Sequence, residues 1–404
     1  MNLAKLTRNH EFRENIMFKI SIPTEYYFGS GALDRIADMS LPGKKALICT
    51  TRGKSVRRYG YLSRLERALQ QKNVAYVLFD ELEPNPTKDS IMSASLRARQ
   101  HGCDFIIGFG GGSAMDASKA IAFMAVNSGD LWDYCTRGTG KGKVPEKEAL
   151  PIVCISTTAG TGSELDAGAV ITNTQTGEKS GVGIPRLFPT ISIVDPDLTL
   201  TVPPQQTAFQ GLDTFYHVAE GYISKASNLM SEMFALTAVE RTAKYLPVCV
   251  QDGNNLEART QMSFANSLGG LVMACGRLTS QHPLEHVLSA HYPDLPHGAG
   301  LLLLAPSYFA TLIRKGAVPE KFVTLAQTMG MKDASKPEDF LEAHRNLLIA
   351  CGVSEIKMSD YGIRFEELKG FASEAVKAMG FPFKSDPVFL SENDFVQIYE
   401  SAWR

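Results

Sequence analysis

The stretch Phe105–Ala120 (FIIGFGGGSAMDASKA) constrains the fold of this chain more than any other feature. A short apolar run leads into a glycine turn, formed by Gly110, Gly111, Gly112 and Ser113, and a helical pattern follows. This order predicts a strand, a tight turn and the N-terminus of a helix. Glycines let the backbone approach a ligand, and a helix N-terminus favours an anion. The stretch therefore predicts a phosphate-binding turn, although a purely structural turn explains a glycine triplet about equally well.

Apolar runs alternate with helical patterns through the first half of the chain. We expect strands at 18–28, 45–50, 75–79, 105–108, 151–156, 169–172 and 191–194, and helices at 32–39, 61–71 and 89–100. Gly177, Glu178 and Lys179 read as the turn between the last two strands. Strands and helices in alternation predict a doubly wound, mostly parallel, Rossmann-like sheet, with ligands at the carboxyl ends of its strands.

The second half of the chain lacks strand patterns. Helical periodicity covers residues 206–224, 228–245, 256–276, 281–291 and 300–314. We therefore expect an N-terminal extension over 1–17, an α/β domain over 18–200 and an all-helical domain over 201–404.

Composition excludes several functional classes. The chain is 44% hydrophobic and 21% charged, with a net charge of −2, which argues against a nucleic-acid partner. Seven cysteines occur singly, without a CxxC pair, which is typical of a reducing cytoplasm. The N-terminus lacks the apolar core of a signal peptide, and no apolar run is long enough to cross a membrane.

A possible metal site lies in the second half. Asp213 and His217 are four residues apart, which places a carboxylate and an imidazole on one helix face. His282 and His286 repeat that spacing, and His297 follows. One carboxylate with two or three imidazoles suits Fe²⁺ or Zn²⁺. Each pair could also be an ordinary surface pair on a helix.

Four motifs together carry a family resemblance. GGGSAMDASKA, TTAGTGSE, DTFYHVAEGY and PHG, in this order, resemble the iron-containing (group III) alcohol dehydrogenases over about residues 26–313. The resemblance implies an α/β dinucleotide-binding domain and an all-helical metal domain, the architecture of dehydroquinate synthase. It also implies hydride transfer between NAD(P)H and a small alcohol or aldehyde bound to Fe²⁺ or Zn²⁺ in the interdomain cleft, by a homodimer or larger homo-oligomer.

The same motifs imply roles for individual residues. Those matching the cofactor site are Gly110, Gly111, Gly112, Ser113, Asp116, Lys119, Thr157, Thr158, Thr161 and Lys179. Those matching the metal ligands are Asp213, His217, His282 and His297. His286 matches a histidine beside the nicotinamide and is the catalytic candidate. It could relay a proton or form a supporting hydrogen bond.

The sequence departs from the family pattern in two places. The run HPLEHVLSAHYPDLPHG is one residue longer than usual in the family. We expect His282 to be the third metal ligand, with His286 as the alternative. The strand at 45–50 is followed by Thr51 and Arg52, at a place where NAD-preferring members often carry an acid. We expect Thr51 to contact the cofactor and NADPH to be accepted, although a solvated turn explains these residues about as well.

Other functions fit the same architecture. One is a related oxidoreductase acting on a sugar acid or a phosphonate aldehyde. Another is an NAD(P)-binding regulatory or sensor protein that retained the fold. Buried histidines and a carboxylate without a metal would be costly, which argues against the sensor.

Overall fold

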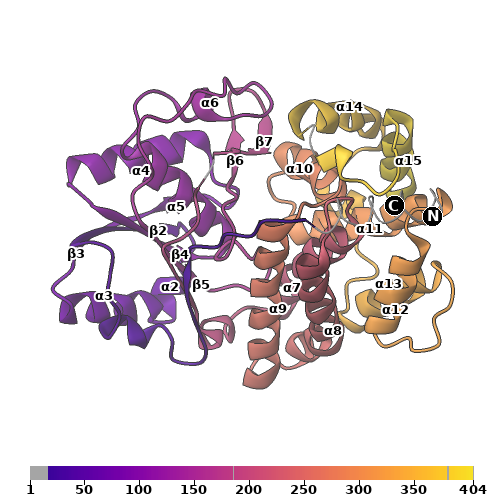
Figure 1. Ribbon diagram of the computed structural model, residues 1–404, viewed down its shortest axis with the longest axis horizontal. Coiled ribbons are helices and arrows are strands. Elements are labelled where there is room, and N and C mark those ends of the chain that lie inside the picture. Colours follow the sequence, from indigo (N-terminus) through magenta and orange to yellow (C-terminus); the bar gives the residue numbers. More distant parts are fainter. Residues whose placement is uncertain (1–16, 185, 380–381, 404) are drawn as a thin grey trace, which may run out of the picture.

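A computed structural model describes residues 17–184, 186–379 and 382–403. Figure 1 shows two parts side by side, an α/β part in indigo to magenta and a helical part in rose through orange to yellow. The expected N-terminal extension lies almost wholly outside the described residues. No helix in the described ranges has the length and apolar character needed to span a bilayer.

The α/β part is built on one six-stranded sheet. Its order is β1-β8-β5-β4-β2-β3, and every neighbouring pair is parallel. The strands are β1 (Glu25–Phe28), β2 (Lys45–Thr51), β3 (Ala75–Leu82), β4 (Phe105–Gly110), β5 (Ile152–Ser156) and β8 (Ile191–Val194). The prediction of a mostly parallel sheet is confirmed. The glycine turn follows β4, which lies between β5 and β2.

Helices cover both faces of this sheet. Along β4, Ile106 packs with the helices α4 (Lys88–Gln100) and α5 (Gly112–Met124), whereas Phe105 and Ile107 pack with α3 (Tyr61–Gln71). Burial on both faces explains why the strand is apolar throughout rather than alternating. Two single-turn helices, α2 (Ser55–Arg58) and α6 (Leu131–Tyr134), lie in the connections, and 32–39 holds a short 3₁₀ turn, η1 (Asp34–Ala37).

A separate hairpin corrects one expectation. Strands β6 (Val170–Asn173) and β7 (Glu178–Gly181) pair antiparallel with each other and lie outside the main sheet. The expected turn at 177–179 is wrong for Glu178 and Lys179, which begin β7; only Gly177, with φ of +73°, lies in the turn. The sequence EKSG has little strand propensity, so pairing with β6 overrides the local preference.

The helical part surrounds α7. Its helices are α7 (Pro204–Ile223), α8 (Leu229–Gln251), α9 (Leu256–Cys275), α10 (Gln281–His291), α11 (His297–Arg314), α12 (Pro319–Thr328), α13 (Asp339–Ala350), α14 (Leu368–Met379) and α15 (Glu392–Ala402). Short 3₁₀ turns are η2 (Pro196–Thr199), η3 (Met358–Tyr361), η4 (Phe365–Glu367) and η5 (Pro382–Lys384). Helix α7 is buried along almost its whole length, as expected of a central helix. The described residues after β8 contain no further strand, so the all-helical prediction is confirmed.

Candidate active site

The glycine turn packs directly against the loop after β5. Gly110 ends β4 with φ of +154°, Gly111 caps α5, and Gly112 is its first residue. A Cβ on Gly111 would lie 2.9 Å from Thr158 Cγ2, and one on Gly112 would overlap the Thr161 side chain. The absence of a side chain therefore lets the two loops meet at the carboxyl ends of neighbouring strands.

Asp116 and Lys119 stabilise the segment that follows this loop. The Asp116 carboxylate accepts a hydrogen bond from Ser163 Oγ at 2.5 Å and another from the backbone N–H of Val170 at 2.8 Å. Lys119 is fully buried, and its Nζ donates to Ser163 Oγ and Asp166 Oδ1 at 2.9 and 2.8 Å. These contacts order residues 163–170 over α5.

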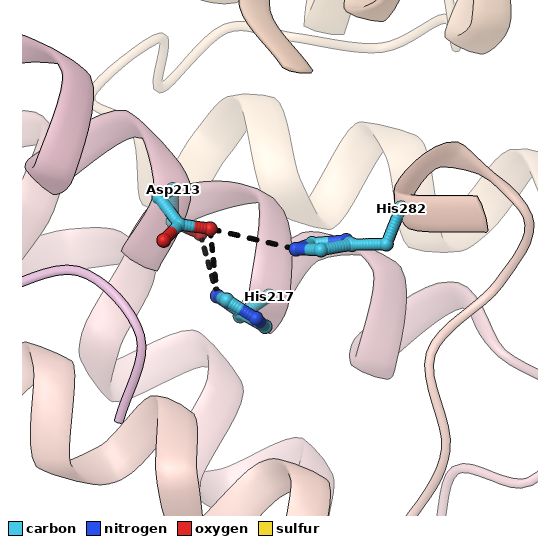
Figure 2. Close-up of side chains that lie close together, drawn as sticks. All are labelled: Asp213, His217 and His282. Atoms are coloured by element: carbon cyan, nitrogen blue, oxygen red, sulfur yellow. Dashed lines mark hydrogen bonds and ion pairs between the residues drawn. The ribbon is translucent and has the colours of Figure 1, made fainter. Parts of the chain in front are cut away.

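Three histidines and one aspartate lie close together in the helical part. Asp213 and His217 lie one turn apart on α7, His282 lies on α10, and His297 is the first residue of α11. Asp213 Oδ1 is 3.1 Å from His217 Nδ1, 3.5 Å from His282 Nε2 and 3.7 Å from His297 Nε2. Figure 2 shows the side chains of Asp213, His217 and His282 pointing toward one another.

Buried acceptors orient all three rings. His282 Nδ1 donates to the carboxylate of Glu220 and His297 Nδ1 to that of Glu285, while His217 Nδ1 bonds the backbone carbonyl of Asp213 at 2.9 Å. An imidazole that donates from Nδ1 keeps the Nε2 lone pair for a metal. The sequence analysis missed both glutamates. Glu220 could have been found, because it follows Asp213 by seven residues and so lies on the same face of α7.

The donor set fits a divalent cation. Asp213 Oδ1 and His282 Nε2 are buried and make no hydrogen bond within the described protein. Burial alone would raise the pKa of Asp213, but the imidazoles of His217 and His297 outweigh it and hold that pKa well below its usual range. An ionised carboxylate with imidazole nitrogens is a donor set suited to Fe²⁺ or Zn²⁺.

His286 lies beside this cluster, one turn after His282. Its ring centroid is 5.4 Å from that of His297, and its Nδ1 makes no hydrogen bond within the described residues. Burial lowers the pKa of His286 well below its usual value, and the charge of Lys179 adds to that effect. The ring is therefore neutral near pH 7.

A cavity of about 370 Å³ joins the glycine turn to the histidines. Its lining includes these predicted site residues: Gly112, Ser113, Asp116, Thr161, Lys179, His217, His282, His286 and His297. Lys179 Nζ donates to Asn85 Oδ1 at 2.9 Å and to Ser289 Oγ at 2.6 Å, and burial lowers the pKa of Lys179. Asn85 also donates from its N–H to Ser113 Oγ at 3.3 Å, so this unpredicted residue joins two predicted ones.

Among the other predicted site residues, the metal ligand Asp213 does not line the cavity, and neither do the cofactor residues Thr51, Gly110, Gly111, Lys119, Thr157 and Thr158. Thr51 ends β2. The next residue, Arg52, donates from Nε to the carbonyl of Glu81 at 2.9 Å and pairs with Glu83 Oε1 at 2.8 Å. A carboxylate that the sequence analysis did not consider, that of Glu83, therefore lies at this edge, just after the end of the neighbouring strand β3.

Known proteins match the chain over nearly its whole length. The family model for iron-containing alcohol dehydrogenases matches residues 23–196, and the model for the family's C-terminal part matches 207–403. NADH-dependent butanol dehydrogenase A of Clostridium acetobutylicum is 32% identical, covering 96% of this chain and all of the relative. A 1,3-propanediol dehydrogenase of Klebsiella pneumoniae is also 32% identical, covering 96% of this chain and 99% of the relative.

Solved structures agree with these matches. A crystal structure of 1,3-propanediol oxidoreductase has a TM-score of 0.87 and 32% identity, covering 96% of this chain and all of that one. An archaeal halo-thermophilic alcohol dehydrogenase from a Red Sea brine pool has a TM-score of 0.90 and 30% identity, covering 96% and 99%. The chain therefore belongs to the iron-containing alcohol dehydrogenase family, and it is an enzyme of the alcohol dehydrogenase class.

Proposed function

We propose that this enzyme transfers hydride between a nicotinamide cofactor and a small alcohol or aldehyde, with one divalent metal ion in the cleft between its two parts. One observation carries the proposal. Asp213 Oδ1 and His282 Nε2 are buried and face each other at 3.5 Å, neither with a hydrogen bond within the described residues, and His282 lines the cavity that the glycine helix also lines. The lining thus combines a phosphate-type helix N-terminus with a metal-type donor set.

The ligands of the ion in this proposal are Asp213, His217, His282 and His297. When bound, a divalent ion supplies Lewis-acid polarisation of the substrate oxygen, and iron is favoured by the family, with zinc possible. His282 groups with Asp213 and His217, whereas His286 groups with Glu285 and His297. This grouping supports His282, rather than His286, as the metal ligand that α10 provides.

Residues outside the metal site bind the cofactor and transfer the proton of the substrate hydroxyl. The first N–H groups of α5, at Gly112 and Ser113, hold the pyrophosphate, while Thr158 and Thr161 keep the second loop against them. Lys179 lies at the nicotinamide end, and His286, neutral and buried, accepts or donates the proton of the substrate hydroxyl. The cavity walls exclude water from the hydride transfer.

Cofactor choice depends on the edge of the sheet at Thr51. The Arg52 guanidinium is bound to Glu83 and to the end of β3, so it is not held ready for a 2′-phosphate. The relative in C. acetobutylicum is named as NADH-dependent. We therefore propose NADH as the better cofactor and treat acceptance of NADPH as a prediction to be measured.

The domain boundary near residue 200 is also a proposal, supported by the end of β8 at Val194 and the start of α7 at Pro204. We further propose a cytoplasmic enzyme that forms a homodimer or larger homo-oligomer. The cytoplasmic location is supported by the cysteines: all seven lie within the described ranges, and none of them forms a disulfide.

Metal-free protein, reloaded with Fe²⁺ or Zn²⁺ and assayed for NADH and NADPH oxidation against an aldehyde panel, tests the proposal. We expect turnover only after reloading. A protein that binds NADH but turns over no aldehyde with either metal would instead be the sensor. Turnover confined to sugar-acid or phosphonate aldehydes would favour the related oxidoreductase.

A further inference from the structure

The loop after β5 contacts the glycine turn on one side. This loop spans residues 157–164 and holds the predicted cofactor threonines, so we call it the threonine loop. The Thr157 N–H donates to the carbonyl of Gly110 at 2.9 Å, and the Thr161 side chain fills the space that a Cβ on Gly112 would occupy. A ligand bound at the glycine turn therefore lies next to this loop as well.

Thr214 joins the threonine loop to the metal site. This buried residue follows Asp213 on α7, and its Oγ1 donates to the carbonyls of Ala159 and Gly160 at 3.3 and 3.2 Å. A Cβ on Gly160 would lie 3.3 Å from Asp213 Oδ2 and 3.2 Å from the Cα of Gln210. The loop backbone thus packs directly against the turn of α7 that carries the aspartate.

Helix α9 holds the end of the same loop. The Gly162 N–H donates to Asn266 Oδ1 at 2.8 Å, and Asn266 Nδ2 donates to Glu164 Oε1 at 2.7 Å. With both ends of the loop fixed, its central residues 159–161 lie between the glycine turn and Asp213. The loop is therefore the direct structural connection between the predicted cofactor site and a predicted metal ligand.

We infer that Thr214 is a positioning residue through which the threonine loop holds Asp213, so that cofactor binding and metal binding strengthen each other. This inference rests on the proposed function, since it concerns the ion and the cofactor of that proposal. A ligand on either side of the loop restricts the loop's motion, so the second ligand binds at a lower cost in conformational entropy. Coupling between two sites is reciprocal, so each ligand raises the affinity of the other by the same factor.

The affinity of the protein for NADH with and without Zn²⁺ measures this factor. NADH is titrated by its fluorescence into the metal-free full-length protein and into the Zn²⁺-loaded protein, without aldehyde. The reverse measurement determines Zn²⁺ affinity by chelator competition, with and without saturating NADH. We expect both measurements to give the same factor, of about tenfold. A factor of one in the wild type would overturn the inference, whatever the variants show.

Two substitutions of Thr214 test its part in the coupling. Thr214→Val removes the hydroxyl and nearly preserves the volume, so we expect the factor to fall about fivefold, as for the loss of one hydrogen bond. Thr214→Ser keeps the donor and should retain the factor. Thr242→Val on α8 is the matched control, because the Thr242 hydroxyl is buried but makes no hydrogen bond within the described residues.

The factor separates this role from a merely structural one. A structural defect would weaken the binding of each ligand equally with and without the other, and direct attraction between the ion and the cofactor phosphates does not pass through Thr214. An unchanged factor in Thr214→Val would therefore overturn the inference, as would an equal fall in Thr242→Val. If the wild type did not bind Zn²⁺ or NADH at all, the proposed function would fail too, whereas uncoupled binding of both would overturn this inference alone.

Discussion

The Nδ1 of His282 donates to the buried carboxylate of Glu220, which leaves His282 Nε2 facing Asp213 Oδ1 at 3.5 Å. A residue seven positions after Asp213 on α7 thus sets the ring orientation of a residue on α10. Glu220 is itself fixed by Thr279, whose Oγ1 donates to Glu220 Oε2 at 2.8 Å. The metal site therefore depends on a second layer of buried hydrogen bonds.

Glu220→Gln should weaken metal binding without removing a ligand. The amide is a poorer acceptor for His282, so we expect metal affinity to fall about 10- to 100-fold. Metal content after dialysis against a graded chelator series measures the change. Glu257→Gln, exposed on α9, is the control. If Glu220→Gln retained as much metal as the wild type, the hydrogen bond to His282 would not contribute to metal binding.

Gly112→Ala should disrupt the contact between the two cofactor loops. Its Cβ would overlap the Thr161 side chain, so we expect a loss of about 1–3 kcal/mol in unfolding free energy and weaker NADH binding. Thr161→Ala in the same chain should restore part of both, because it removes the overlapping atoms. Gly370→Ala, where a Cβ meets nothing within 4 Å, is the control. Purely additive losses in the double variant would argue against this contact.

Glu164 should make stability depend on pH. Burial raises its pKa to about 7 from an ordinary 4.5, although its Oε1 accepts from Asn266 and Ser267. Between these values the folded state binds more protons than the unfolded state, so the unfolding free energy falls as pH rises from about 4.5 to 7. Glu164→Gln removes the charge but keeps the acceptor oxygen.

This variant should therefore gain up to about 3 kcal/mol over wild type at pH 8.5 and little at pH 4.5. Urea denaturation at both pH values measures the difference. The control for removing one carboxylate is Glu240→Gln, at an exposed position in the middle of α8. The account of Glu164 would be wrong if its variant also differed from wild type by the same amount at both.

Glu83→Gln should shift cofactor selectivity toward NADPH. It weakens the pairing with Arg52 and frees the guanidinium for a 2′-phosphate, so we expect the NADPH to NADH ratio of kcat/KM to rise about tenfold. Glu81→Gln is a matched control, because Glu81 holds Arg52 only through its backbone carbonyl and its side chain pairs with Arg97. An unchanged ratio in Glu83→Gln would remove Arg52 from cofactor selection.

The elements with a strong local pattern could be predicted from the sequence. The strand ending at Gly110 and the helix starting at Gly112 follow directly from FIIGFGGGS, and α3 and α10 begin and end where their periodicity does. Helix α11 begins earlier than expected, at His297, because Pro296 and the buried helix start are not apparent from apolar spacing. Strand β7 could not be predicted, because its polar sequence is ordered by its partner strand.

The site could be predicted only in part. Spacing indicated Asp213, His217 and His282, since each lies in a motif along one helix. Long-range partners left no local signal: Ser289 meets Lys179 across 110 residues, and the backbone carbonyl of Glu81 reaches Arg52 from another strand. The roles of the metal ligands, of the cofactor residues and of His286 stay predictions.

The metal content of His282→Ala beside that of His286→Ala tests the central claim most directly. Each variant is stripped, incubated with Fe²⁺ and desalted, and iron per chain is measured together with aldehyde-dependent NADH oxidation. We predict about one ion per chain in wild type and His286→Ala, and neither bound iron nor turnover in His282→Ala. Full iron content in His282→Ala, or turnover in metal-free wild type, would contradict the account.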